Sequence, residues 1–353
     1  MGCGMADLSM QLIDAFIKDF PGHKPGTRPV HAKGSLATGL FRGSHAAGKY
    51  CIAPHFQPVL TNVTVRFSNG NGSMDPDATR QVRGMAVKFH IGNAVRDEAR
   101  GRLRSDLETD LIAVNVSQFM TKTPEELLDF LAAAVPRPAR QPSTVERLKA
   151  LLTLVPVIVP DPGVTMSSDA GVAEYARHHS PARAFVLANS LLAPPTSYFR
   201  TAYHAVHAFD VEGSDGTHRW GRFFWEPADG VRTHAAADVP ELDADYLAKD
   251  LVHRSEEYPS RFNLRMQLAD PEDDPTDPTT IWPQNRRRIL MGTLRLWAHA
   301  DRQGEAEKLS FNPGRLVPGI AMSDDPTLQA RVEVYNESQR RRGAEICPVS
   351  GAQ

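Results

Sequence analysis

The stretch NVTVRFSNG (residues 62–70) decides the fold class, because apolar and polar residues alternate along it. A period of two is typical of a β-strand that has one buried face. Val63 and Phe67 fall on one face of this strand, and Arg66 and Ser68 fall together on the other. The stretch therefore predicts a strand that presents an arginine and a serine on the same side of a sheet.

Similar strands recur along the chain, and helices separate them. Strands rich in β-branched and aromatic residues are predicted at 83–92, 203–211, 219–226, 260–269 and 291–300. Apolar spacing and capping residues predict helices at 5–20, 121–131, 142–155, 240–253 and 325–343. Because strands bracket helices without regular alternation, we expect the α+β class, with a mainly antiparallel sheet that can close as a barrel. We expect a single domain over residues 1–353.

Composition narrows the classes of function. A chain of 353 residues with 41% apolar residues can bury a sizeable core. The formal charge of −2 excludes a protein that coats nucleic acid by bulk electrostatics. No run of about 18 apolar residues is present and the first residues lack a signal-peptide pattern, so we expect no membrane partner and a cytoplasmic location. The 3 cysteines are widely spaced, which argues against a disulfide framework or a zinc site.

The stretch DDPTLQARVEVYNESQRRRG (324–343) carries a stripe of polar residues. Asp325 as a cap and the proline after it predict a helix that runs toward Gly343. The spacing i, i+4, i+7 and i+11 brings four side chains to one face of this helix: Arg331, Tyr335, Ser338 and Arg342. A guanidinium one turn from a phenol favours the phenolate, an anionic ligand known for haem iron. The simpler alternative is a surface pair on an amphipathic helix.

The histidines give weaker signals. His31 lies between small apolar residues in RPVHAKGS (28–35), where a lone histidine is more often a core residue than a base. His204 and His207 are three residues apart in a predicted strand, so they point to opposite faces. This spacing argues against a zinc site at that pair.

Five ordered blocks of the sequence resemble the signature blocks of the haem catalases. They are RPVHAKG (28–34), VRFSNG (65–70) followed by DATRQVRGMAVKFH (77–90), WPQ (282–284), FNPGRLVPGIAMSDDPTLQARVEVY (311–335) and QRRR (339–342). The resemblance covers residues from about 20 to 343. The long N-terminal arm of full-length catalases and the segments beyond their haem-ligand helix have no counterpart, so the chain is similar to the small catalase-related peroxidases.

The resemblance implies a catalase-like barrel with surrounding helices and haem b buried between the barrel and the C-terminal helix. His31 matches the distal histidine, which moves a proton between the two peroxide oxygens, and Ser68 matches the serine that holds it. A neutral imidazole whose pKa lies near the working pH suits this proton transfer. Tyr335 matches the tyrosinate ligand of the iron, and Arg331 the arginine that keeps it ionised. The other matched contacts to haem are Arg28, Arg66 and Arg342 on the propionates, together with Val30 and Phe119 in the pocket.

Several positions depart from the family pattern. The family's distal asparagine falls on Val114 without a gap, whereas a shift of one residue brings Asn115 to the peroxide; we adopt Asn115 and keep Val114 as the alternative. Met120 and Leu127 replace aromatic residues of the distal side, and Gln81 replaces an acidic residue of the main channel. Fewer aromatic walls and no fixed negative charge would admit bulkier, less polar peroxides.

We therefore expect a haem peroxidase that reduces organic hydroperoxides, and hydrogen peroxide more weakly, through an oxo-ferryl intermediate in oxidative-stress defence. Its electrons would come from an unidentified organic donor, and a homodimer is the expected assembly. A true catalase is the main alternative. An allene oxide synthase-like enzyme is disfavoured because Val30 stands where those enzymes have threonine. A noncatalytic haem or lipid carrier built on a barrel is disfavoured because a carrier needs no distal histidine.

Overall fold

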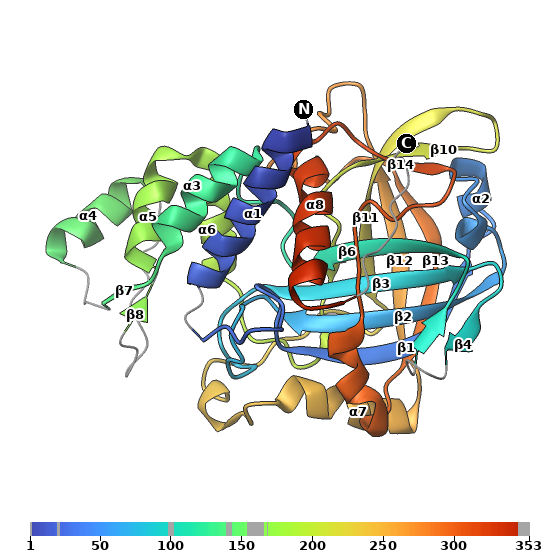
Figure 1. Ribbon diagram of the computed structural model, residues 1–353, viewed down its shortest axis with the longest axis horizontal. Coiled ribbons are helices and arrows are strands. Elements are labelled where there is room, and N and C mark those ends of the chain that lie inside the picture. The colour runs from blue at the N-terminus through green and yellow to red at the C-terminus, as the bar shows by residue number, and fades with distance from the viewer. Residues whose placement is uncertain are drawn as a thin grey trace.

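The computed structural model describes residues 2–19, 22–97, 102–138, 143–153, 166–167 and 169–344. Eight of its strands form a closed antiparallel barrel, with helices packed around it and extending to one side (Figure 1). The barrel strands are β1 (Gly34–Gly43), β2 (Leu60–Asn69), β3 (Arg83–Ile91), β6 (Leu107–Val114), β9 (Tyr203–His204), β11 (His218–Pro227), β12 (Ser260–Leu268) and β13 (Arg288–Trp297). The barrel closes because β12 pairs with both β13 and β11. The predicted α+β class with a closed barrel is confirmed.

The remaining elements lie outside the barrel. Strands β10 (Phe209–Glu212) and β14 (Ile320–Met322) extend the sheet from β11, and short pairs are formed by β4 (Val95–Asp97) with β5 (Arg102–Arg104) and by β7 (Arg137–Pro138) with β8 (Met166–Ser167). The helices are α1 (Gly2–Asp19), α2 (Ala47–Tyr50), α3 (Pro124–Ala134), α4 (Thr144–Thr153), α5 (Asp169–His178), α6 (Ser180–Ser190), α7 (Tyr246–Glu257) and α8 (Pro326–Arg341). Short 3₁₀ helices are η1 (Pro54–Phe56), η2 (Tyr198–Arg200), η3 (Val239–Glu241) and η4 (Ala300–Lys308).

Two predicted elements are interrupted. The strand predicted at 203–211 divides into β9 and β10, because the chain leaves the ladder around His207, whose ring turns to Asp325. The helix predicted at 240–253 begins only at Tyr246, after the proline-containing turn of η3. The other predicted strands and helices are present, with ends that differ by a few residues.

The alternation along β2 separates the barrel core from the functional side. Val63 and Phe67 are buried in the large apolar core inside the barrel. Arg66 and Ser68 face outward, opposite Leu36 and Gly34 of β1. They are nevertheless buried, because loops and α8 cover this part of the outer surface. The face predicted for Arg66 and Ser68 from the sequence is thus the covered outer face of the barrel.

Helix α8 is held at its start by a cap and along its length by α1. Asp325 Oδ1 accepts hydrogen bonds from the backbone N–H groups of Thr327 (2.8 Å) and Leu328 (3.2 Å), as the sequence predicts for an N-cap. Figure 1 shows α1 lying beside α8, at the join between the helical side and the barrel. An ion pair between Asp14 and Arg341 (2.5 Å) ties the two helices together.

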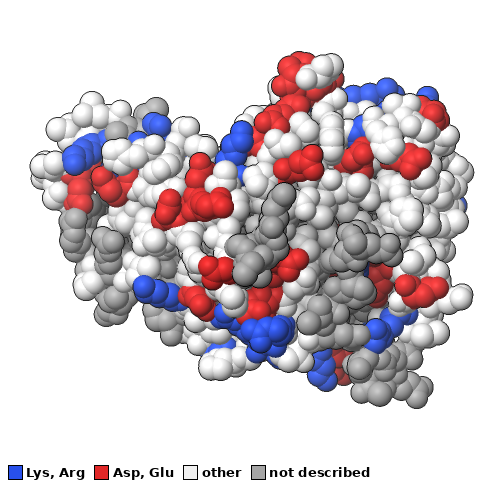
Figure 2. Space-filling view, turned by 45° about the horizontal axis from the view of Figure 1, so that its top comes forward, with Lys and Arg blue, Asp and Glu red and all other residues white. Residues whose placement is uncertain are grey.

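On the face drawn in Figure 2, acidic and basic side chains are interspersed among uncharged residues. Within the described ranges, no helix combines the length and apolar character needed to cross a membrane.

His55 is an ionisable residue inside the apolar core. Its side chain is 1% exposed, and its ring centroid lies 4.2 Å from that of Phe56 and 4.5 Å from that of Phe89. Neither ring nitrogen has a hydrogen-bond partner among the described residues. Burial lowers the pKa of His55 to about 3, so the folded protein keeps this ring neutral at pH 5.

We predict that replacing His55 by Phe makes folding less sensitive to acid. The unfolded chain protonates this histidine below about pH 6.5 while the folded chain does not, so the unfolded state gains about 2 kcal/mol at pH 5 relative to pH 7.5. The His55→Phe variant should lose that part of the pH dependence in urea unfolding measured at both pH values. His253→Gln, at a side chain 74% exposed, is the control. Equal acid sensitivity of His55→Phe and the parent would contradict the prediction.

Candidate functional site

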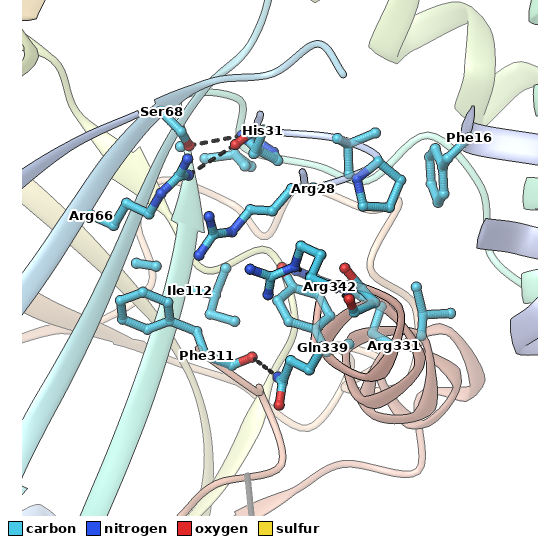
Figure 3. A pocket seen from close by; sticks show the side chains of 18 of the residues that line it. Phe16, Arg28, His31, Arg66, Ser68, Ile112, Phe311, Arg331, Gln339 and Arg342 are labelled. Carbon is cyan, nitrogen blue, oxygen red and sulfur yellow. Dashed lines mark hydrogen bonds between the residues drawn. The ribbon is translucent and has the colours of Figure 1, made fainter. Parts of the chain in front are cut away.

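A cavity lies between the outer face of the barrel and α8, and α1 closes one edge of it (Figure 3). Its polar side chains come from the 28–31 loop, from β2 and from α8. Most of its remaining wall is apolar and includes Ile13, Phe16, Pro29, Val30, Met85, Ile112, Val114, Phe311 and Val334. Seven segments of the chain, from α1 near its start to α8 near residue 340, therefore converge on one space.

His31 is held in this cavity in a strained conformation. Its φ is 57°, and it is the one non-glycine residue with positive φ in the described part of the chain. Its N–H donates to the carbonyl of Gly70 (3.0 Å), and its own carbonyl accepts from Arg66 Nη1 (2.9 Å). Its ring nitrogen Nδ1 lies 3.0 Å from Ser68 Oγ. Backbone and ring are therefore both fixed by specific partners.

The electrostatic surroundings keep the His31 ring neutral. Burial, followed by the positive charges of Arg66, Arg331 and Arg28, lowers the pKa of His31 to about 3. This differs from the expectation of a pKa near the working pH, which took no account of the three guanidiniums. A neutral imidazole is able to accept a proton throughout the range from pH 5 to pH 8.

Two glycines make room for the pair formed by His31 and Ser68. Gly34 of β1 and Gly84 of β3 lie directly opposite Ser68 in the sheet. A Cβ atom on Gly84 would lie 2.7 Å from Ser68 Oγ and 2.9 Å from His31 Nδ1, which is too close for either contact. A Cβ atom on Gly34 would lie 2.3 Å from Cζ of Arg66. The absence of side chains at these positions therefore lets imidazole, hydroxyl and guanidinium share the outer face.

Helix α8 presents its polar stripe to the cavity. Arg331, Tyr335, Ser338 and Arg342 all line it, as their spacing in the sequence predicts. Arg331 Nη2 donates to the Tyr335 hydroxyl oxygen (3.3 Å). The spacing thus correctly placed these four side chains on one face, and this face is turned toward the cavity.

Three arginines gather at one end of the cavity. Arg28 Nη1 and Arg66 Nη2 lie 2.7 Å and 2.6 Å from the carboxylate of Glu307. Arg342 Nη1 donates to the backbone carbonyl of Glu307 (3.3 Å). Burial and the neighbouring guanidiniums lower the pKa values of Arg28 and Arg342. No local pattern in the sequence points to Glu307, which joins this cluster from η4.

These residues fit a haem group. Arg28 and Arg66 share one carboxylate side chain, whereas Arg342 binds only a backbone carbonyl. Nε of the buried Arg66 has no partner within the described residues, so the cluster suits a ligand with two further carboxylates. The apolar walls suit a flat macrocycle, and Tyr335 beside Arg331 offers an oxygen donor. Within the described ranges, no group of three or more His, Cys, Asp or Glu residues could hold a metal ion. His204 and His207 therefore belong to no such group.

The structure corrects two placements. Val114 lines the cavity, whereas Asn115 continues the pairing of β6 with β3: its N–H donates to Arg83 O (2.9 Å) and its Oδ1 accepts from Arg83 N (2.7 Å). The prediction that the Asn115 side chain faces a bound peroxide therefore differs from its observed position, where it binds the backbone of β3. Phe119 does not line the cavity; its ring packs 5.7 Å from that of His207 and 5.9 Å from the Arg331 guanidinium.

The three departures used to argue for a looser distal side also lie outside the cavity wall. Gln81 Oε1 accepts a hydrogen bond from the N–H of Asn71 (2.8 Å). Leu127 and Met120 belong to the apolar cluster around α3. Val30 and Val114, by contrast, are apolar residues that line the cavity together with His31.

Sequence reasoning missed the pair formed by His207 and Asp325. Their Nδ1 and Oδ2 atoms lie 2.5 Å apart, and both side chains are buried. The same carboxylate caps α8, so His207 helps to fix the start of the helix that carries Tyr335. The two residues are 118 positions apart, and no local pattern links them.

Comparisons with known proteins agree with the fold and the cavity. The Catalase family profile matches residues 8–346. A catalase-related peroxidase of Mycolicibacterium paratuberculosis is 32% identical over 346 residues, which cover 96% of this chain and 97% of that protein. A catalase-related peroxidase of Synechococcus elongatus is 28% identical over 326 residues, covering 91% and 86%. Catalase isozyme 2 of Solanum tuberosum is 28% identical over 341 residues, covering 92% of this chain but 61% of the potato protein.

Matches of this extent define the molecule as a peroxide-acting oxidoreductase. More narrowly, the chain belongs to the catalase family. Membership in this family implies that it binds haem.

We predict that Gly84→Ala strongly impairs peroxide consumption. The added methyl group must displace Ser68 Oγ or the His31 ring, and misplacement of about 1 Å near reacting atoms costs on the order of 100-fold in rate. Gly304→Ala is the control, because a Cβ atom there meets no atom within 4 Å. Peroxide loss measured by absorbance, with haem content and melting temperature recorded, tests the effect. If Gly84→Ala consumed peroxide at the parent rate, the placement of His31 and Ser68 beside Gly84 would not matter for the reaction, and the prediction would be wrong.

Proposed function

We propose that the chain is a haem b peroxidase that reduces organic hydroperoxides, and hydrogen peroxide more weakly, with electrons from an organic donor. The observation that carries this proposal is the distal wall, where neutral His31 stands beside Val30 and Val114 and the Asn115 amide is bound to β3. An oxidative-stress role, a homodimer and a cytoplasmic location stay predictions from the sequence.

The residues of the cavity have distinct roles in this proposal. Tyr335 would bind the iron through its hydroxyl oxygen, which accepts a hydrogen bond from Arg331. Arg28, Arg66 and Arg342 would hold the haem propionates through charge-assisted hydrogen bonds. Haem, when bound, supplies the redox-active iron at which the peroxide O–O bond is cleaved.

His31 manages the proton in the proposed reaction. As a neutral base it takes the proton from the peroxide oxygen that binds and delivers it to the oxygen that leaves. Ser68 fixes the orientation of the imidazole through its contact with Nδ1, and the hydrogen bond from Arg66 to the His31 carbonyl fixes the backbone. The His31 side chain therefore both removes the proton from one peroxide oxygen and donates it to the other.

The apolar distal wall favours an alkyl substituent on the peroxide. Hydrogen peroxide has a second hydroxyl group that loses a water partner on entry, and Val30 and Val114 offer it no hydrogen bond. An alkyl hydroperoxide presents carbon to these valines and gains from burial. The site therefore disfavours hydrogen peroxide, whose second hydroxyl group lacks a hydrogen-bond partner there, and selectivity toward organic hydroperoxides follows.

We predict that Tyr335→Phe abolishes the parent's ferric haem spectrum, because phenylalanine has no oxygen to bind the iron. Tyr258→Phe, at a side chain 53% exposed, should leave the spectrum unchanged. Absorption spectra of the purified, haem-supplied proteins provide the measurement. If Tyr335→Phe kept the parent spectrum, or if the parent bound no haem, the proposed ligand assignment would fail.

We predict that Val114→Asn raises the rate with hydrogen peroxide, relative to cumene hydroperoxide, by about fivefold, since a new hydrogen bond to substrate is worth on the order of 1 kcal/mol. Stopped-flow absorbance with both peroxides gives the ratio. Val334→Asn, which puts the same amide on the α8 wall, is the control. The proposal would be overturned by a parent that prefers hydrogen peroxide and evolves oxygen from it rapidly, which is the result expected for a true catalase.

A further inference from the structure

The segment at the end of η4 contacts all three arginines of the cavity. The carboxylate of Glu307 bridges Arg28 and Arg66, its backbone carbonyl accepts from Arg342, and the carbonyl of Leu309 accepts from Arg28 Nη2 (2.5 Å). Figure 3 shows the three arginine side chains directed toward the same part of the cavity. This segment therefore organises the cluster from outside the barrel.

Arg66 connects this segment to the distal histidine. Its guanidinium donates to the carbonyls of His31 and Ala32 (both 2.9 Å) and to Glu307 Oε1 (2.6 Å). It lies against Gly34, where a Cβ atom would come within 2.3 Å of its Cζ. A shift of the Arg66 guanidinium would therefore move the peptide of His31, which is strained at its φ of 57°.

The charges of the cluster also require Glu307. The side chain of Arg66 is 3% exposed and that of Arg28 is 11% exposed, so their mutual repulsion is poorly screened by water. Although partial burial opposes ionisation, the charges of Arg66 and Arg28 lower the pKa of Glu307, which keeps its carboxylate charged. With two propionates added, the three guanidiniums would face three carboxylates. Glu307 thus supplies a carboxylate to the cluster in the chain with or without haem.

We propose that Glu307 is a positioning residue for the reaction: it fixes the Arg66 guanidinium and, through Arg66, the backbone of the distal His31. The link from Glu307 to Arg66 holds in the haem-free chain, whereas its effect on His31 in the reaction rests on the proposed haem function. The two parts therefore require separate measurements.

The first measurement uses the haem-free chain and Glu307→Ala. The Glu307 side chain is 46% exposed, so acetate can reach the space that the substitution opens beside Arg28 and Arg66. We expect a lower melting temperature for Glu307→Ala, with a selective gain when acetate replaces chloride at equal ionic strength. Glu305→Ala is the control, because Glu305 lies in the same segment but pairs with Arg302 (2.8 Å). No loss of stability, or no selective effect of acetate, would overturn the link to Arg66.

The second measurement uses the haem-loaded proteins and cyanide. Hydrogen cyanide must give up its proton when it binds ferric iron, so its association rate reports how well His31 is placed to accept that proton. We expect about tenfold slower association for Glu307→Ala, with partial recovery in acetate and a normal rate for Glu305→Ala. An unchanged cyanide rate together with lost stability would make Glu307 merely structural and refute the positioning role. Failure of the parent to bind haem would refute the proposed function instead, and the haem-free measurement would still decide the link to Arg66.

Discussion

The rest of the site depends on how one buried guanidinium, that of Arg66, is held. A cation inside a protein is tolerated only where carbonyl and carboxylate oxygens replace its water. The carbonyls of His31 and Ala32 supply part of this environment, and so the contacts that satisfy the cation also fix the strained peptide of the histidine. The position of the Arg66 guanidinium and the position of the His31 imidazole are therefore coupled, and a change in one alters the other.

The barrel serves this site with its outer surface. Aromatic and aliphatic side chains fill its interior, among them Phe41, Phe89 and Trp225, so the cavity lies outside it under α8. A carrier of the lipocalin kind would instead hold its ligand within the barrel. Strand alternation places polar side chains such as Arg66 and Ser68 on the outer face. They are buried because helices and loops cover that part of the face. The architecture thus provides a rigid floor for a site that the helices complete.

The parts of the site that depend on local periodicity were predictable from the sequence. Alternation along β2 placed Arg66 with Ser68, and helical spacing placed Arg331 with Tyr335. The end of β6 was not predictable, because the hydrogen bonds that turn Asn115 to β3 depend on strand register between segments about 30 residues apart. The pairing of His207 with Asp325 and the approach of η4 to the arginines depend on tertiary structure alone. The low pKa of His31 follows from the same convergence, since it is caused first by burial and then by the guanidiniums of Arg66 and Arg331, which are distant in sequence.

The position of α1 has a consequence for how the protein is made. Ile13 and Phe16 of α1 close one edge of the cavity, and α8 forms the opposite wall. The ribosome synthesises α1 first and α8 more than 300 residues later, at residues 326–341. The barrel strands emerge between them, so the cavity has its full set of walls only after α8 has been synthesised. Capture of a large planar cofactor therefore has to wait for α8, and the exposed apolar face of α1 must be kept from aggregation until then.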